Sequence, residues 1–235
     1  GDTVASALLA NNIRIVGRSY KYGRPRGIVS CGSEEPNGIL QLGSTEATQT
    51  PNVRATQQEI YEGLECRTTN GWPSVEYDLM GVFGRLFSKF LPAGFYYKTF
   101  MFPAALWGLY EHFIRRVAGL GRARSAVDPD VYDHLNDHAD VVIIGAGVAG
   151  MQVASVLAKS GVRLMLIDER PRLGGSLLVD HPQINGSESQ KWLKDIEDQF
   201  EAAGVTILRR TTVVGYHDHN YCLLYTSPSP RDRTR

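Results

Sequence analysis

Residues 140–175 carry glycines and an acid whose spacing could bind a phosphate-bearing ligand. The run Asp140–Ile144, which is β-branched after its first residue, is followed at once by Gly145, Gly147 and Gly150, in the pattern GxGxxG. Gly145 permits a tight turn after a strand, Gly147 lets the backbone approach a diphosphate, and Gly150 lets a helix pack close to a sheet. The N-terminus of that helix offers unpaired N–H groups to phosphate oxygens. The pattern therefore predicts a dinucleotide site.

An acidic residue stands where the ribose of such a ligand would lie. Asp168 follows the apolar run Val162–Ile167 and comes 18 residues after Gly150, near the spacing of about 20 for a carboxylate that binds ribose hydroxyls. A carboxylate there favours a free 2′-hydroxyl and repels a 2′-phosphate, which points to NAD or FAD rather than NADP. Arg170 or Arg172 would relax that exclusion. NAD is the predicted cofactor, and FAD is the alternative.

A second pair of glycines follows the acid. Arg172-Leu173-Gly174-Gly175 resembles the flavoprotein RxGG motif, and a glycine pair lets a loop cross close to a dinucleotide; the alternative is a plain turn. No catalytic residue and no metal ligand is predicted in this chain. The residues predicted to bind the cofactor are Gly145, Gly147, Val148, Ala149, Gly150, Asp168, Glu169, Arg170, Gly174 and Gly175.

A strand–helix–strand unit of a parallel sheet is needed to position these residues. We predict a helix over 151–160 that Gly161 ends, and a second helix that begins at a capping box, Ser187–Gln190, and ends at Gly204. Strands are predicted at 140–144, 162–167, 205–208 and 211–216.

The composition excludes several classes of protein. Hydrophobic residues make up 43% of the 235 residues and charged residues 21%, which argues against a wholly disordered chain. The 25 Lys and Arg equal the 25 Asp and Glu, so the basic excess of a nucleic-acid binder is missing. The most apolar run, 100–110, is too short for the roughly 20 residues that cross a bilayer. We therefore predict no nucleic-acid or membrane partner, and a cytoplasmic location.

The two halves of the chain carry opposite net charge. Residues 1–127 have a net charge of +4 and residues 128–235 a net charge of −4, and the change falls in a stretch at 121–130 that suits a linker. The tail has two prolines and no periodicity, and it resembles translated adapter sequence, so no function is placed on it. The predicted domains are 1–90, an aromatic-rich helical connector at 91–135, a partial dinucleotide-binding domain at 136–221, and the tail at 222–235.

Three further clusters have open interpretations. Arg14, Arg18, Lys21, Arg24 and Arg26 occur without an acid, which suits a phosphate or partner-docking patch or, alternatively, a solvated face. The helix that continues the apolar run to Val117 suits burial between domains, with a membrane-surface helix as the alternative. The histidine pairs 134/138 and 217/219 have the spacing of metal ligands but lack a third ligand.

Several stretches resemble the alpha subunit of heterotetrameric sarcosine oxidase, over nearly all of residues 1–221. They are Gly1–Ala10, Gly17–Tyr22 with Arg24–Gly27, Gly32–Asn37, Pro51–Thr56, Gly94–Pro103 and Thr211–Tyr221. The resemblance implies an α+β ferredoxin-like N-terminal domain followed by an incomplete α/β Rossmann-type domain, a doubly wound parallel sheet. It also implies beta, gamma and delta subunits as partners.

The same resemblance implies a reaction for the whole complex. Sarcosine is oxidatively demethylated to glycine with formation of hydrogen peroxide, and the one-carbon unit passes to tetrahydrofolate. FAD lies in a different subunit, FMN lies at the alpha–beta interface, and NAD lies in the alpha subunit, on Gly145, Gly147, Gly150 and Asp168. The alternatives are a subunit of an opine, proline or cyanide-forming oxidase, or a module that binds NAD without chemistry.

The first domain also resembles a ferredoxin-like domain that carries a [2Fe–2S] cluster in related amine dehydrogenase subunits. Cys31 begins the corresponding loop, but Pro36, Ile39 and Thr56 stand where the other cysteines are expected. Because cluster ligation takes about four thiolates, we predict a structural remnant without a cluster.

Overall fold

The computed structural model describes residues 2–19, 21–79, 81–82, 86, 102–127, 131–180, 182–184 and 186–226. It divides into two compact units, Gly1–Tyr132 and Asp133–Arg235, each described by itself below. No helix in these ranges is long and apolar enough to cross a membrane. Most of the aromatic segment at 94–103, and residues 227–235 of the tail, lie outside the described residues. The predicted domain limits at 90, 135 and 221 stay predictions.

The first unit opens with helix α1 (Val4–Ala10), which a reciprocal cap starts. The Thr3 hydroxyl accepts a hydrogen bond from the Ser6 amide at 3.3 Å, and the Ser6 hydroxyl accepts one from the Thr3 amide at 3.0 Å. Thr3 is therefore the N-cap of this helix. Val4 and Ala5 then pack with Leu40 and Ala55 in a small core.

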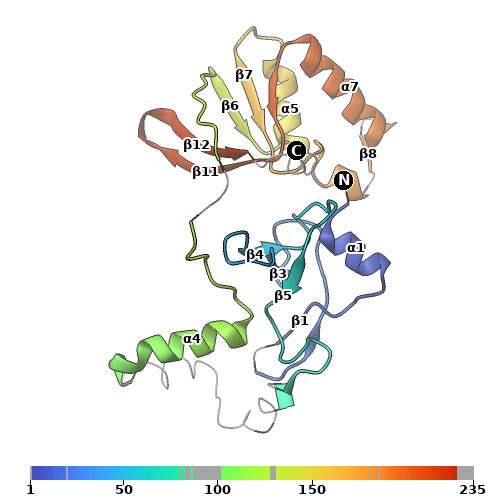
Figure 1. Ribbon diagram of the computed structural model, residues 1–235. Coiled ribbons are helices and arrows are strands. Elements are labelled where there is room, and N and C mark those ends of the chain that lie inside the picture. Colours follow the sequence, from blue (N-terminus) through green and yellow to red (C-terminus); the bar gives the residue numbers. More distant parts are fainter. Residues whose placement is uncertain are drawn as a thin grey trace. The chain divides into compact units, whose positions relative to one another are not determined.

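A three-stranded antiparallel sheet forms the rest of that core. Strand β3 (Ile39–Leu42) lies in the middle, between β4 (Thr50–Arg54) and β5 (Cys66–Thr68). A separate hairpin joins β1 (Gly17–Arg18) to β2 (Pro25–Arg26). Figure 1 shows the strands of the sheet grouped beside α1.

The last helix of the first unit is α4 (Trp107–Ala118), which follows a short 3-10 turn, η2 (Ala104–Leu106). It ends at Gly119, which has a left-handed backbone. Trp107 and Leu109 are exposed within their unit. The predicted burial of this helix between domains therefore stays a prediction.

The second unit is built on a parallel sheet with the strand order β10-β7-β6. The strands are β6 (Val141–Ile144), β7 (Leu164–Ile167) and β10 (Thr206–Leu208), as the sequence predicted to within two residues. All of β7 is buried, since it is the central strand, and its last residue, Ile167, pairs with Ile144 at the end of β6. The residues that follow β6 and β7 are thereby brought to the same edge of the sheet.

Two long helices pack on this sheet and on each other. They are α5 (Val148–Leu157) and α7 (Ser189–Ala202), and the Gln199 amide nitrogen donates to the Ser155 carbonyl at 2.9 Å across them. Figure 1 shows α5 beside β7, with α7 on the side of α5 away from β6. Their buried side chains form one core with the sheet and the short helix α6 (Leu177–Asp180).

Two helix boundaries differ from the predicted ones. Helix α5 spans 148–157 rather than 151–160, because Gly147 serves as its N-cap and Gly161 lies in the turn beyond its end. The predicted capping box was wrong. Ser187 pairs in the small hairpin of β8 (Gln183–Ile184) and β9 (Ser187–Glu188), and Glu188 is an N-cap without a side-chain hydrogen bond. Gly204 follows the last turn of α7, as predicted.

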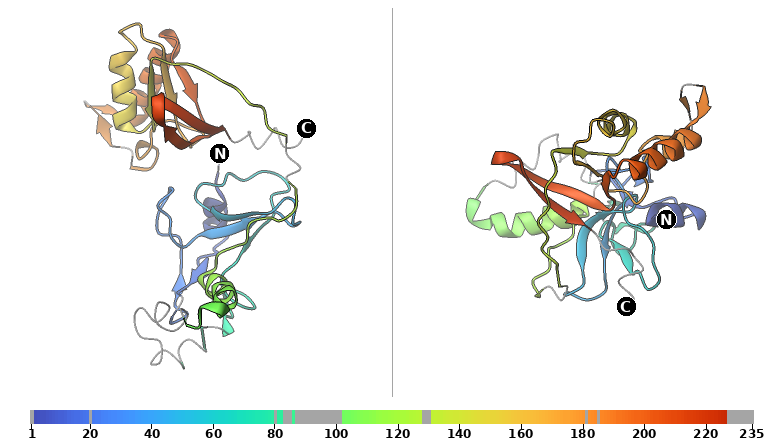
Figure 2. Two further views of the ribbon diagram at one scale, coloured as in Figure 1. Left: turned by 90° about the vertical axis from the view of Figure 1, so that its left-hand side faces the viewer. Right: turned by 90° about the horizontal axis from the view of Figure 1, so that it is seen from above.

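An antiparallel hairpin ends the described chain. Strand β11 (Thr211–His217) and strand β12 (Tyr221–Thr226) are joined by the 3-10 turn η3 (Asp218–Asn220). Figure 2 shows this hairpin from two further directions. Strand β12 continues across the predicted limit at 221, so the first five residues of the predicted tail are paired in this hairpin.

Candidate functional site

The glycine-rich turn after β6 has the geometry that its sequence predicted. Gly145 has φ +95°, a conformation that side chains disfavour, and its amide donates to the Ile167 carbonyl at 2.8 Å. A Cβ on Gly150 would lie 1.9 Å from the Gly145 carbonyl oxygen, so only glycine allows the helix this close to the turn. A Cβ on Gly147 would meet no atom within 4 Å, which leaves open space for a ligand.

Helix α5 starts from this turn with its amides uncapped by any side chain. Gly147 is the N-cap, and no side chain accepts a bond from the first turn. No acidic residue lies in that turn, where Val148 and Ala149 are exposed. The first N–H groups of a helix have no partner within it and carry partial positive charge. The N-terminus of α5 can therefore bind a phosphate group.

Asp168 faces the turn from the end of β7. Its Oδ2 accepts a hydrogen bond from the Ala146 amide at 2.6 Å, and its Oδ1 accepts one from the Arg170 amide at 2.8 Å. A carboxylate has about four lone-pair sites, so it can still accept further hydrogen bonds from a ligand. The structure thus brings together the predicted acid and the predicted phosphate turn.

The glycine pair at 174–175 packs on the same turn. The Gly174 amide donates to the Ala146 carbonyl at 2.8 Å, and a Cβ on Gly175 would lie 3.0 Å from the Cα of Gly147. Arg170 closes the loop, because its Nη1 donates to the Gly175 carbonyl at 3.3 Å. The pair therefore runs directly beside the GxGxxG turn.

Ala146 was not singled out from the sequence, yet it connects the other parts. It is fully buried, its amide donates to Asp168, and its carbonyl accepts from Gly174. Only its place as a variable position inside GxGxxG marks it in the sequence, because both contacts are made by its backbone.

Glu169 and Arg172, which the sequence suggested as neighbours of the cofactor, make none of the contacts described above. Glu169 is exposed. Arg172, which would have relaxed the exclusion of NADP, lines a separate cavity of about 260 Å³ with Leu193, Lys194 and Arg209. Of the two arginines, Arg170 is therefore the one that contacts the glycine loop.

An ion pair lies at the end of the sheet opposite to the glycine turn. Arg163 Nη2 lies 2.7 Å from Asp140 Oδ1. Hydrogen bonds from the Arg163 side chain and amide lower the pKa of Asp140 to about 2. The pair joins the starts of β6 and β7, so we assign it a structural role.

The histidine pairs bring no metal site together in the described chain. Nowhere in it do three His, Cys, Asp or Glu side chains converge as metal ligands. In the hairpin, the His217 ring lies 6.0 Å from the Tyr221 ring.

In the first unit, a loop at residues 28–38 is organised by one buried carboxylate. Glu35 is fully buried, and its Oε2 accepts from the amides of Val29 and Ser30, both at 2.8 Å. Its Oε1 accepts from Asn37 and Gly38, at 2.8 and 3.1 Å. Burial raises the pKa of this carboxyl, but the four N–H bonds lower it further, so the net pKa is below its ordinary value.

Two domain models match the chain. A "2Fe-2S iron-sulfur cluster binding domain" matches residues 1–71, and an "NAD(P)-binding Rossmann-like domain" matches residues 143–182. The second match contains the glycine turn, Asp168 and the glycine pair described above. Together with the parallel sheet, it confirms a Rossmann-like dinucleotide fold in the second unit.

Similar proteins extend over nearly the whole chain. It is 49% identical to "Sarcosine oxidase subunit alpha" of Rhizobium meliloti over 94% of its length, and 36% identical to that of Corynebacterium sp. (strain U-96) over 95%. The chain is homologous to sarcosine oxidase alpha subunits. The homology covers only 22% and 18% of those relatives, so the chain spans about a fifth of their length.

A solved structure shares the fold. The L-proline dehydrogenase of P.horikoshii matches 95% of this chain with a TM-score of 0.50, at 18% identity, and the match covers 33% of that protein. This likeness supports the fold of the two units.

The residues of the first unit do not fit the cluster that its domain model implies. Within residues 1–71 the cysteines are Cys31 and Cys66, and both are exposed. About four thiolates are needed to hold such a cluster. At a position predicted for a ligand, the buried Thr56 hydroxyl donates instead to the Gly32 carbonyl at 2.7 Å. Glu35 supplies the negative charge at the centre of the loop.

Proposed function

We propose that this chain is the NAD-binding part of the alpha subunit of a sarcosine-oxidising complex. The observation that carries the proposal is the hydrogen bond from the Ala146 amide to Asp168, which joins a carboxylate to the glycine-rich turn. This site lies in a chain homologous to sarcosine oxidase alpha subunits over 94% of its length. Both facts favour a nucleotide-binding role within an amine oxidoreductase.

The residues of the turn suit NAD more than NADP. Gly145, Gly147 and Gly150 would hold the diphosphate at the start of α5, where backbone amides face an anion. Asp168 would accept hydrogen bonds from ribose hydroxyls and would repel a 2′-phosphate. Gly174 and Gly175 would border the cofactor from the neighbouring loop. Bound NAD supplies a nicotinamide ring that accepts a hydride, and the role of this chain is to bind and orient it.

The activity of the whole complex is part of the proposal. We assign to it the oxidative demethylation of sarcosine to glycine, with hydrogen peroxide as a product and transfer of the one-carbon unit to tetrahydrofolate. The beta, gamma and delta subunits are its proposed partners, and FAD and FMN are bound outside this chain. No catalytic residue is assigned to residues 1–235.

The cofactor proposal is tested by nucleotide binding to the purified chain. Asp168→Asn removes the charge that faces the ribose, so its Kd for NAD rises by about tenfold, and its preference for NAD over NADP shrinks. Titration calorimetry with each nucleotide measures both effects. The matched control is Asp195→Asn on the exposed side of α7, which leaves both affinities unchanged.

Two results would contradict the assignment. One is equal affinity of the unchanged chain for NAD and NADP, which would remove the role of Asp168. The other is a flavin that stays with the chain through gel filtration and is displaced by neither nucleotide, which would favour FAD.

The substrate is tested separately, by peroxide formation from sarcosine, proline or an opine in the complex assembled with the full-length subunit. Sarcosine is the expected substrate.

A further inference from the structure

The β1–β2 hairpin of the first unit presents its cations from a fixed backbone. Gly17 pairs with Arg26, and Arg18 pairs with Pro25. The loop between them is closed by hydrogen bonds from the Ser19 amide to the Arg24 carbonyl and from the Gly23 amide to the Ser19 carbonyl, both at 2.9 Å. These two bonds fix the positions of Ser19, Gly23 and Arg24 at the ends of the loop.

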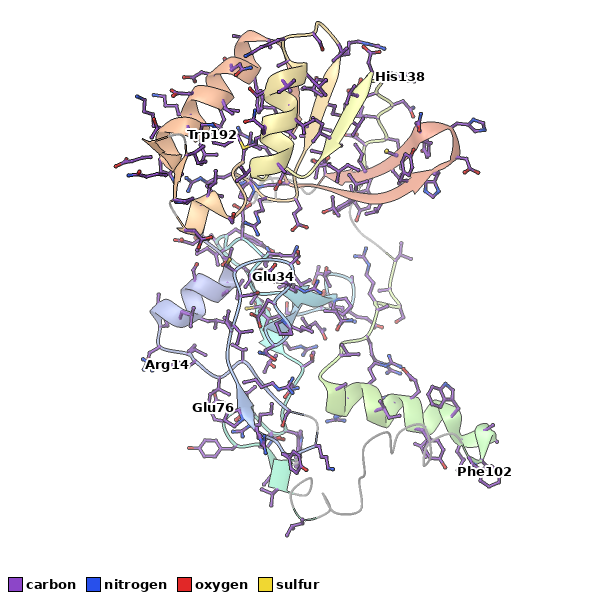
Figure 3. The ribbon with its side chains drawn as sticks, turned by 180° about the vertical axis from the view of Figure 1, so that it is seen from behind. Arg14, Glu34, Glu76, Phe102, His138 and Trp192 are labelled. Atoms are coloured by element: carbon purple, nitrogen blue, oxygen red, sulfur yellow. The ribbon has the colours of Figure 1, made fainter. Side chains whose placement is uncertain are left out.

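One cation of the hairpin is used to hold that loop in place. The Arg18 guanidinium donates to the carbonyls of Val75, Gly23 and Glu76, the last two at 2.8 Å. Glu76 is labelled in Figure 3. Because these contacts engage all three guanidinium nitrogens, Arg18 anchors the hairpin, and it does not line the cavity described next.

The remaining cations gather around one cavity. A surface cavity of about 540 Å³ is lined by Ser19, Lys21, Tyr22, Arg24, Pro25 and Arg26. Lys21 Nζ lies 5.2 Å from the centre of the Tyr22 ring, and the Arg24 guanidinium carbon lies 5.0 Å from it. The ring attracts both cations through its quadrupole and so keeps them together.

No acid in the described part of the chain offsets these charges. Lys21, Arg24 and Arg26 form no ion pair there, and no acidic residue contributes to the cavity lining. Three like charges around one cavity repel one another, and an anion bound between them would relieve that repulsion. The Ser19 hydroxyl accepts a hydrogen bond from the Arg24 amide at 2.9 Å, so its own proton remains to be donated.

We infer that this cavity binds the phosphate group of a small molecule, at a site separate from the dinucleotide turn of the second unit. A single carboxylate carries one charge, whereas a phosphate monoester or diphosphate carries about two or more, which match three cationic donors. Guanidinium groups suit the oxygens of phosphate because they can donate two parallel hydrogen bonds. The cavity volume lies within the range of small-molecule sites, about 300–1,000 Å³.

The inference does not depend on the proposed function. It rests on the first unit alone, whereas the dinucleotide site lies wholly in the second. Loss of one site by mutation is therefore expected to leave the other intact.

Titration calorimetry of the full 235-residue chain with inorganic pyrophosphate tests the inference. The titration is repeated with the Gly147→Ala variant, whose added methyl blocks the glycine turn, so that binding at that turn is told apart from binding at the cavity. The expected result is saturable binding to the unchanged chain that weakens as salt concentration rises. The combined variant Lys21→Gln, Arg24→Gln and Arg26→Gln lowers the affinity by at least about tenfold.

The matched control is Arg14→Gln, labelled in Figure 3, which removes an exposed arginine outside the cavity lining. It changes the affinity by less than about twofold. Should the triple variant lose the circular dichroism of the unchanged chain, the single variant Arg24→Gln decides, with an expected loss of at least about threefold.

Three outcomes would overturn the inference. They are no saturable pyrophosphate binding by the unchanged chain, equal binding by the folded triple variant, and tighter binding of a polyglutamate peptide than of pyrophosphate. The last outcome would identify the cavity as a docking surface for an acidic protein.

Discussion

Gly147 and Gly150 occur in one turn but meet different physical demands. Gly150 is needed for packing, because a Cβ there would overlap the Gly145 carbonyl oxygen at 1.9 Å. Gly147 is not needed for packing, because a Cβ there would meet nothing within 4 Å. Its requirement would come from the ligand alone. Substitution by alanine adds one methyl group at either position, so the two variants test folding and ligand binding separately.

We predict opposite effects of alanine at these two positions. Gly150→Ala destabilises the second unit by about 3 kcal/mol, since the added methyl forces the helix away from the turn. Gly147→Ala costs less than about 1 kcal/mol of stability but lowers NAD affinity by at least about tenfold. Urea unfolding and NAD titration measure the two effects. Full NAD affinity in folded Gly147→Ala would show that no diphosphate approaches that residue.

Glu35 holds its loop by charge rather than by a metal. Its pKa is lowered from the ordinary value of 4.5, so its stabilising effect is fully present above that pH and is lost as pH falls through the lowered folded-state value. We predict that Glu35→Gln destabilises the first unit by about 2 kcal/mol at neutral pH, because an amide cannot accept all four N–H bonds. The difference in the free energy of unfolding between this variant and the unchanged chain becomes smaller as the pH falls.

Denaturant unfolding at several pH values measures this effect. The control is Glu34→Gln at the exposed neighbouring position, which alters stability by less than about 0.5 kcal/mol. Equal stability of the Glu35 and Glu34 variants at neutral pH would mean that the loop does not depend on the buried carboxylate.

At the scale of elements, the sequence predicted the strands and the glycine turn well because their signals are local. The apolar runs before Gly145 and Asp168 mark two buried strands, and the parallel pairing of their ends follows from the order strand, helix, strand. The start of α5 was misplaced because Gly147 caps that helix with its backbone. Ser187 was wrongly assigned to a capping box because it pairs across a hairpin with Ile184, and no local sequence pattern indicates that pairing.

Helix α1 offers a test of how much one capping hydrogen bond stabilises the first unit. Thr3→Ala removes the hydroxyl that accepts from the Ser6 amide, so we expect a loss of about 1 kcal/mol in stability of the first unit. Thr3→Ser keeps a hydroxyl at the cap and restores most of it. Thermal unfolding followed by circular dichroism compares the three proteins. If serine and alanine destabilise the unit equally, the hydroxyl at position 3 does not stabilise helix α1.

At the scale of the molecule, the sequence could not predict the contacts that complete the glycine-rich turn and the Glu35 loop. Ala146 contributes through its amide and carbonyl, which have no signature in its side chain. Glu35 is preceded by another glutamate, and glutamates are seldom fully buried. In both cases the decisive partners are backbone groups from other segments, which only the folded chain brings together.

The division into two units predicts where a protease cuts first. Residues 131–139 have no regular secondary structure, and Val131 and Leu135 are at least 90% exposed. Exposed segments of this kind are preferred sites of cleavage. We expect endoproteinase Asp-N to cleave before Asp133 or Asp137, ahead of Asp168 and Asp195 within the second unit. Mass spectrometry of early time points identifies the site. A first cut at Asp168 would mean that the turn of the proposed nucleotide site opens more readily than residues 131–139, which the buried strand beside that turn argues against.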